Sequence, residues 1–186
     1  MPPGYRFEHD ANAVARVVLG KSTWSVLALV CLVELVTQAH FKQAFVLDES
    51  LSPLFKDVFR FHWMEESQHA VVDELEWRAE DATLTVEARD QAVADLVDLV
   101  GAVNALVCAQ AAADAAYFLD HAGRAFDDRQ REGLNATFLA AYRYQYILSG
   151  VELTRFAEIL RAMLTDAQYG RVVAALPEVG RPAASP

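Results

Sequence analysis

Residues 61–69 read Phe-His-Trp-Met-Glu-Glu-Ser-Gln-His, and this stretch sets a carboxylate between two imidazoles. The steps from His62 to Glu66 and from Glu66 to His69 are four and three residues, so on an α-helix the three side chains form one row. Three such groups are costly to bury without a partner, and a metal ion is the partner that their chemistry favours. The stretch therefore predicts a helix that carries metal ligands on its inner face.

Helical signals continue before this stretch, whereas hairpin turns between alternating runs are nearly absent from the chain. A first helix is predicted from about residue 10 to residue 46, with an interruption at residues 20–22. Ser52 followed by Pro53 is typical of a helix start. The helix that carries the row should therefore begin there and run to about Glu80.

Two more long helices and a short one are predicted after it. Thr85 should begin the third helix, which ends before Gly123. Asp127 and Thr165 are each followed three residues later by Gln, a spacing that is typical of a capping box at a helix start. The predicted third, fourth and fifth helices cover residues 85–121, 127–164 and 165–176.

The fold class predicted from these elements is all-α. Four long helices with short connections favour an up-down-up-down four-helix bundle, followed by a short fifth helix. We expect residues 1–176 to form a single domain. Residues 177–186, rich in Pro, Ala and Ser, are expected to be a disordered C-terminal tail.

The composition of the chain argues against some classes of binding partner. Asp and Glu number 26 against 16 Lys and Arg, which gives a net charge of -10 and argues against nucleic-acid binding. No signal-peptide pattern is visible, and the most apolar stretch, residues 24–36, is short and contains Glu34. Cys31 and Cys108 lie in apolar helices and are expected to be small buried side chains rather than ligands. We therefore expect a cytoplasmic protein without a membrane partner.

The expected topology brings further polar residues to the row. Glu34 and Glu66 lie at about equal distances from the loop that joins their helices, so they should sit at the same level. Asp114, counted back from the end of the third helix, should lie near the level of His62. The predicted metal ligands are Glu34, His62, Glu66, His69 and Asp114.

Glu34 followed by His62-x3-Glu66-x2-His69 resembles half of the metal site of the p-aminobenzoate N-oxygenase family and, more broadly, that of ferritin-like diiron carboxylate proteins. The resemblance covers about residues 30–80. It implies a ferritin-like bundle that binds two irons and uses dioxygen to oxidise a small organic substrate, in that family an aromatic amine. The family pattern also has a second Glu and a second Glu-x-x-His, which the predicted third and fourth helices lack.

Three hypotheses follow. The first is an iron protein, with one or two ions, that binds dioxygen and oxidises a small organic substrate. The second is a non-enzymatic helical scaffold or dimerisation module, whose polar cluster is metal-free or vestigial. The third is a single zinc or manganese ion with a structural or hydrolytic role, because His and carboxylate ligands alone do not select the metal. The large apolar content also favours a homodimer.

Overall fold

The computed structural model describes residues 2–46 and 48–180, and the regular structure in this part of the chain is entirely helical. The predicted all-α class is thus confirmed. The elements are α1 (Ala11–Leu19), α2 (Thr23–His40), the π-helical turn η1 (Phe41–Phe45), α3 (Pro53–Asp81), α4 (Val86–His121), α5 (Asp128–Arg143), the π-helical turn η2 (Tyr144–Leu148), α6 (Ser149–Val151), α7 (Thr154–Met163) and α8 (Asp166–Gly180).

The helix starts fall where the sequence predicts them. Ser52 and Thr85 each accept a hydrogen bond from the backbone N–H three residues further on. Asp127 and Gln130 form a reciprocal capping box, and Thr165 makes the same arrangement with the glutamine three residues after it. Each cap satisfies backbone donors that the first helical turn leaves without a partner.

Two helix boundaries differ from the prediction. The expected fourth helix is not continuous: η2 and α6 follow α5, and α7 starts afresh at Thr154. Gly150 packs directly on α2 within this break, where a Cβ atom would lie 2.6 Å from Leu32 Cδ1. At the C-terminal end, α8 continues to Gly180, beyond the predicted boundary at Pro177, and residues 181–186 of the expected tail lie outside the described residues.

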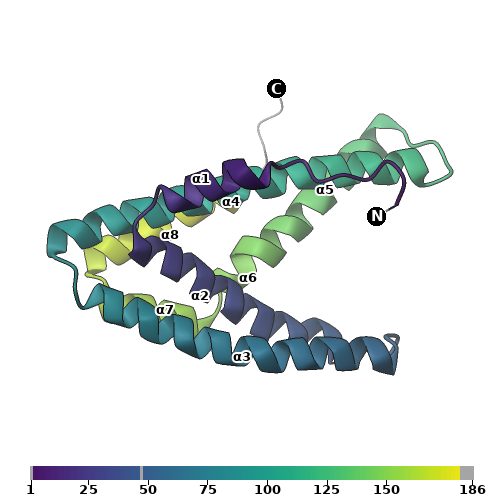
Figure 1. Ribbon diagram of the computed structural model, residues 1–186. Coiled ribbons are helices and arrows are strands. Elements are labelled where there is room, and N and C mark those ends of the chain that lie inside the picture. The colour runs from purple at the N-terminus through teal and green to yellow at the C-terminus, as the bar shows by residue number, and fades with distance from the viewer. Residues whose placement is uncertain (1, 47, 181–186) are drawn as a thin grey trace.

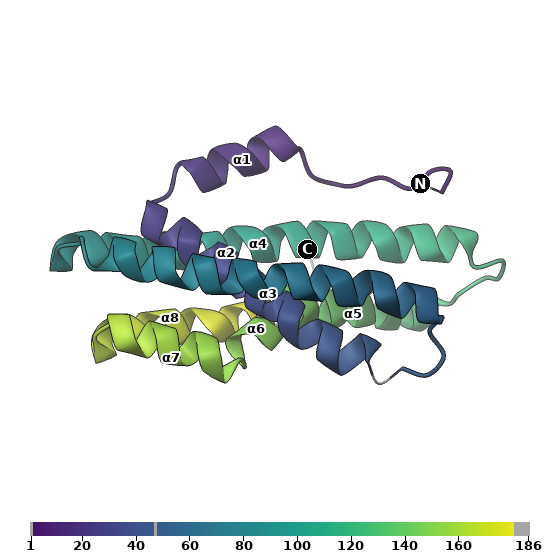
Figure 2. The ribbon, with the colours of Figure 1, turned by 60° about the horizontal axis from the view of Figure 1, so that its bottom comes forward.

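The long helices form two antiparallel pairs, α2 with α3 and α4 with α5, which contact each other mainly through α2 and α4 (Figure 1). The pairs are close together where the chain turns from α3 into α4 and diverge toward the other end. The short helices α7 and α8 fill the closed end (Figure 2). The segment before α1 runs along α4, where the Glu8 backbone N–H donates to Gln110 Oε1 at 3.0 Å.

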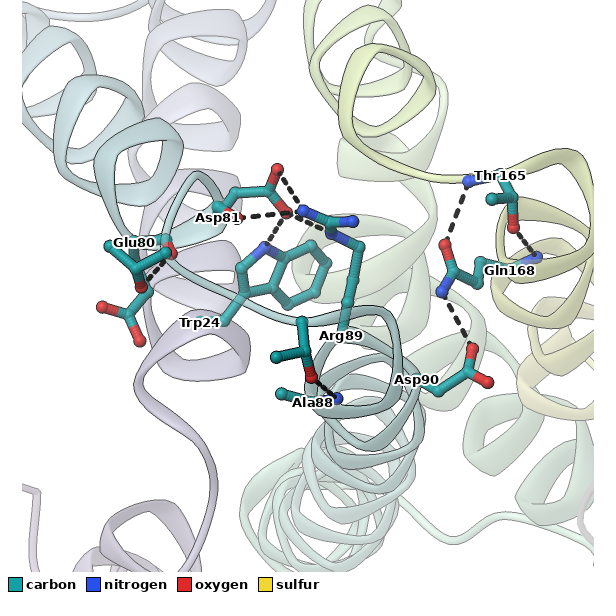
Figure 3. Close-up of polar contacts among 10 residues, drawn as sticks. Trp24, Glu80, Asp81, Ala88, Arg89, Asp90, Thr165 and Gln168 are labelled. Carbon is teal, nitrogen blue, oxygen red and sulfur yellow. Dashed lines mark hydrogen bonds and ion pairs between the residues drawn. The ribbon is translucent and has the colours of Figure 1, made fainter.

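The closed end holds the main hydrophobic core. Trp24 of α2 and Trp77 of α3 are fully buried with their ring centroids 5.1 Å apart, and Phe156 of α7 stacks on Trp77. Asp81 accepts hydrogen bonds from Trp24 Nε1 at 2.9 Å and from Arg89 Nε at 2.7 Å, so it ties α2 to the turn between α3 and α4 (Figure 3). Residues 61–69, in the middle of α3, are much less covered, and none of their side chains is fully buried.

Two segments, Thr23–Phe45 and Val86–His121, are long and apolar enough to cross a membrane if length and composition alone are considered. Core helices of soluble proteins meet the same criterion, so this is weak evidence for a membrane span. The expectation of no membrane partner stays a prediction.

Candidate metal centre

Glu34 on α2 meets Glu66 and His69 on α3. One ligand atom from each of these three side chains lies within 4.8 Å of the others. The antiparallel pairing of α2 and α3 across a short connection puts the two glutamates at one level, as counting from the loop predicted. Because Glu66 and His69 are three residues apart on one helix, α3 presents both toward Glu34.

Glu66 is held between the two histidines of the row. His69 Nδ1 donates to Glu66 Oε2 at 2.8 Å, and His62 Nδ1 lies 3.1 Å from Glu66 Oε1. Side-chain exposure is 15% for Glu66 but 48% for His62 and 52% for His69. The carboxylate is therefore nearly enclosed, while both imidazoles border solvent.

The pKa values of the two glutamates are shifted in opposite directions. Burial raises the pKa of Glu34, and its hydrogen bond to Glu66 and the negative charge of Glu66 raise it further. The same hydrogen bond, together with the two histidines, lowers the pKa of Glu66 despite its burial. Like charges this close disfavour the ionisation of both carboxylates, and of the two it is Glu34 whose protonated form is favoured. A metal cation would take the place of that proton.

Asp73 adds a third carboxyl group to this region. It lies one turn beyond His69, and its Oδ2 atom is buried without a hydrogen-bond partner. Burial raises the pKa of Asp73, the negative charges of Glu76 and Glu66 act in the same direction, and His69 opposes them. The four-residue spacing from His69 puts Asp73 on the same side of α3 as the row. An orphaned buried carboxylate oxygen is what a site built for a cation would show.

Asp114 belongs to a different network. Tyr142 of α5 donates its hydroxyl hydrogen bond to Asp114 Oδ2, and Gln110 Nε2 donates to Oδ1 at 2.8 Å. Burial and the neighbouring Asp114 carboxylate together raise the pKa of Tyr142. The structure thus brings Glu34, Glu66 and His69 together, whereas His62 lies outside this group of three and contacts Glu66 alone among them. Asp114 lies among residues of α4, α5 and the N-terminal segment.

Two clefts lie along α2, and of these two the first includes a residue of the row. One, of about 330 Å³, is lined by His62 together with Phe59 and Trp63 on α3 and with residues of α2, η1 and η2. The other, of about 430 Å³, lies between α2 and α4 and is mainly apolar. They share three lining residues, Thr37, Gln145 and Tyr146. Volumes of this size fit small organic molecules.

The donor set combines carboxylate oxygens with imidazole nitrogens, which suits iron, manganese or zinc. No protein-family model matches the sequence, and neither the curated proteins nor the solved structures contain a match. The argument for a metal therefore rests on the residues and their geometry.

Proposed function

We propose that this chain is a ferritin-like metal protein that binds iron between α2 and α3 through Glu34, Glu66 and His69. The observation that carries the proposal is that one ligand atom from each of these three side chains lies within 4.8 Å of the others. The orphaned carboxylate oxygen of Asp73 supports it. Manganese and zinc are the alternative occupants for the same ligands.

Iron bound with free coordination positions would supply the reactivity with dioxygen. The proposed activity is the oxidation of a small organic substrate. The protein residues prepare the site for this. Glu34 would be deprotonated to bind the cation, and the histidines beside Glu66 would hold its carboxylate in place. The cleft lined by His62, Phe59 and Trp63 would hold the small substrate next to the row.

Replacing Glu66 tests the site. We expect Glu66→Ala to weaken binding of anaerobic Fe(II) by about 100-fold or more, because it removes the ligand that both histidines hold. Asp57→Ala is the matched control: Asp57 is an exposed carboxylate on the same helix, half a turn away from the ligand side, and pairs only with Arg60 in the described structure. Metal per chain by elemental analysis and helicity by circular dichroism are the measurements.

Equal iron content in the Glu66→Ala variant and the wild-type protein would overturn the proposal. So would a wild-type protein that takes up no iron, manganese or zinc. In that case the second hypothesis, a metal-free helical scaffold, would hold. It is favoured by one observation, namely that Glu66 already has hydrogen-bond partners without a cation.

A further inference from the structure

We infer that two copies of this chain pair through the open side of their α2–α3 hairpins and form one metal centre to which each copy supplies half of the ligands. This inference rests on the proposed function, because it concerns which further residues complete the metal centre that Glu34, Glu66 and His69 begin. The partner is a second copy of this chain, related by a two-fold axis that faces the two groups of ligands toward each other.

The ligand count is the first argument. A two-metal carboxylate centre in a four-helix bundle takes one Glu from each of two helices and one Glu-x-x-His from each of the other two. This chain has a single Glu-x-x-His, at Glu66 and His69, and one partner glutamate, Glu34. No other group of three possible ligands occurs within residues 2–46 and 48–180. The α2–α3 hairpin is therefore half of such a centre, and a two-fold axis supplies the other half.

Exposure on the ligand side is the second argument. His62 and His69 are about half exposed although they contact the central carboxylate. On α2, Val30 and Val33 next to Glu34 are 40% and 52% exposed. A metal centre in such a position would remain open to water along one whole side of the hairpin.

The third argument is an apolar surface on α3 that continues from the two histidines. Val58 lies four residues before His62 and Val72 three residues after His69, so both share their side of the helix. Leu54 and Phe61 extend this surface, and all four side chains are between 49% and 75% exposed. Since Ala70 and Trp77 are buried on the other side, α3 is apolar on two sides, which is typical of a helix covered on both.

The size of this surface fits a dimer. We name it the hairpin face; it consists of Val30, Val33, Leu54, Val58, Phe61, His62, His69 and Val72. Its side chains expose on the order of 700 Å², close to the ~800 Å² that each partner buries in an interface of standard size. A two-fold arrangement of two such hairpins pairs the face with itself, as a closed homodimer requires.

Substitutions of two neighbouring valines on α3 can test whether this interface forms. Val72 belongs to the hairpin face, whereas Val71 is rotated by about 100° and is similarly exposed, at 59% against 49%. We expect wild-type protein with anaerobic Fe(II) to have twice the chain mass of 20.6 kDa in light scattering after gel filtration, with two irons per dimer. Val72→Glu should be a monomer with at least about tenfold weaker iron binding, while Val71→Glu should resemble wild-type protein.

Other outcomes of this experiment distinguish the shared metal centre from the proposed function. A wild-type monomer with a full content of iron would overturn the shared centre and leave the proposed function standing. Monomeric Val72→Glu that binds iron as tightly as wild-type protein would do the same. Equal loss of dimer and of iron in both valine variants would also contradict it, because the effect would not follow the hairpin face. Absence of iron from wild-type protein would remove the proposed function first.

Discussion

At the scale of residues, the candidate ligands divide by how local their positions are. His62, Glu66 and His69 belong to one helix, and their spacing alone fixes their common side. Glu34 required only a count across one short connection, and that count is correct. Predicting the position of Asp114 required the assumption that the third helix packs beside the first two in a closed bundle. Because the two helix pairs diverge, this assumption does not hold, and Asp114 contacts Tyr142 and Gln110 instead.

Asp95 is a residue whose ionisation should stabilise the fold. Burial alone would raise its pKa, but hydrogen bonds from Ser22 and Gln91 and the charge of Lys21 outweigh burial and lower it. A folded-state pKa below the ordinary value of about 4 stabilises the protein above that pH, and this contribution is lost as the pH falls through the folded pKa. We expect Asp95→Asn to reduce the free energy of unfolding by about 1 kcal/mol at pH 7.

Asp98 provides the control for this prediction, because it also pairs with Lys21 but its side chain is 65% exposed. Asp98→Asn should change stability by less than about 0.5 kcal/mol. Urea unfolding at pH 7 and at pH 3 measures both variants. The deficit of Asp95→Asn should shrink at pH 3, and a deficit that is constant with pH would contradict the assigned role of the carboxylate.

At the level of single helices, the helix starts could be predicted from the sequence, but the interruption of the predicted fourth helix could not. Ser52 and Asp127 carry their capping chemistry within three residues of sequence, and both caps form. The break after α5 depends instead on a contact between distant segments, because Gly150 lies against α2. A glycine within a helical pattern is compatible with a continuous helix as well as with close packing, so the pattern alone did not locate the break.

Two glycines therefore should respond in opposite ways to the same change. An added Cβ at Gly150 would lie 2.6 Å from Leu32 Cδ1 and 2.7 Å from Val36 Cγ2, so Gly150→Ala must displace buried side chains. We expect a loss of about 1–2 kcal/mol in unfolding free energy. Gly101 in α4 has no atom within 4 Å of the added Cβ, so Gly101→Ala should stabilise the protein by about 0.5–1 kcal/mol. Thermal unfolding of the two variants is the measurement, and stabilisation by both would contradict the close approach of α6 to α2.

At the scale of the whole molecule, the two helix pairs are joined firmly at one end only. The aromatic core around Trp24 and Trp77 lies at this closed end, whereas the candidate metal centre lies near the middle of the α2–α3 hairpin. The all-α class could be read from the sequence because each helix carries its own signals. The divergence could not, since it depends on which apolar sides of α2, α3 and α4 find partners, and the apolar side of α3 that bears Phe61 is exposed.

Asp81 is the polar contact that fastens the closed end, and its removal should affect the whole molecule. Its carboxylate, with 14% of the side chain exposed, accepts from the buried Trp24 indole and from Arg89. Asp81→Ala would leave a buried N–H without a partner and a mostly buried guanidinium without its counter-charge. We expect it to cost about 3 kcal/mol of unfolding free energy.

Glu80→Ala is the control, because the Glu80 carboxylate points away from this cluster (Figure 3) and should contribute less than about 0.5 kcal/mol. Chemical denaturation followed by tryptophan fluorescence and by circular dichroism distinguishes a global effect from a local one. If Asp81 joins the two helix pairs, both signals shift together to lower denaturant, whereas an early change in fluorescence alone would limit its role to the surroundings of Trp24.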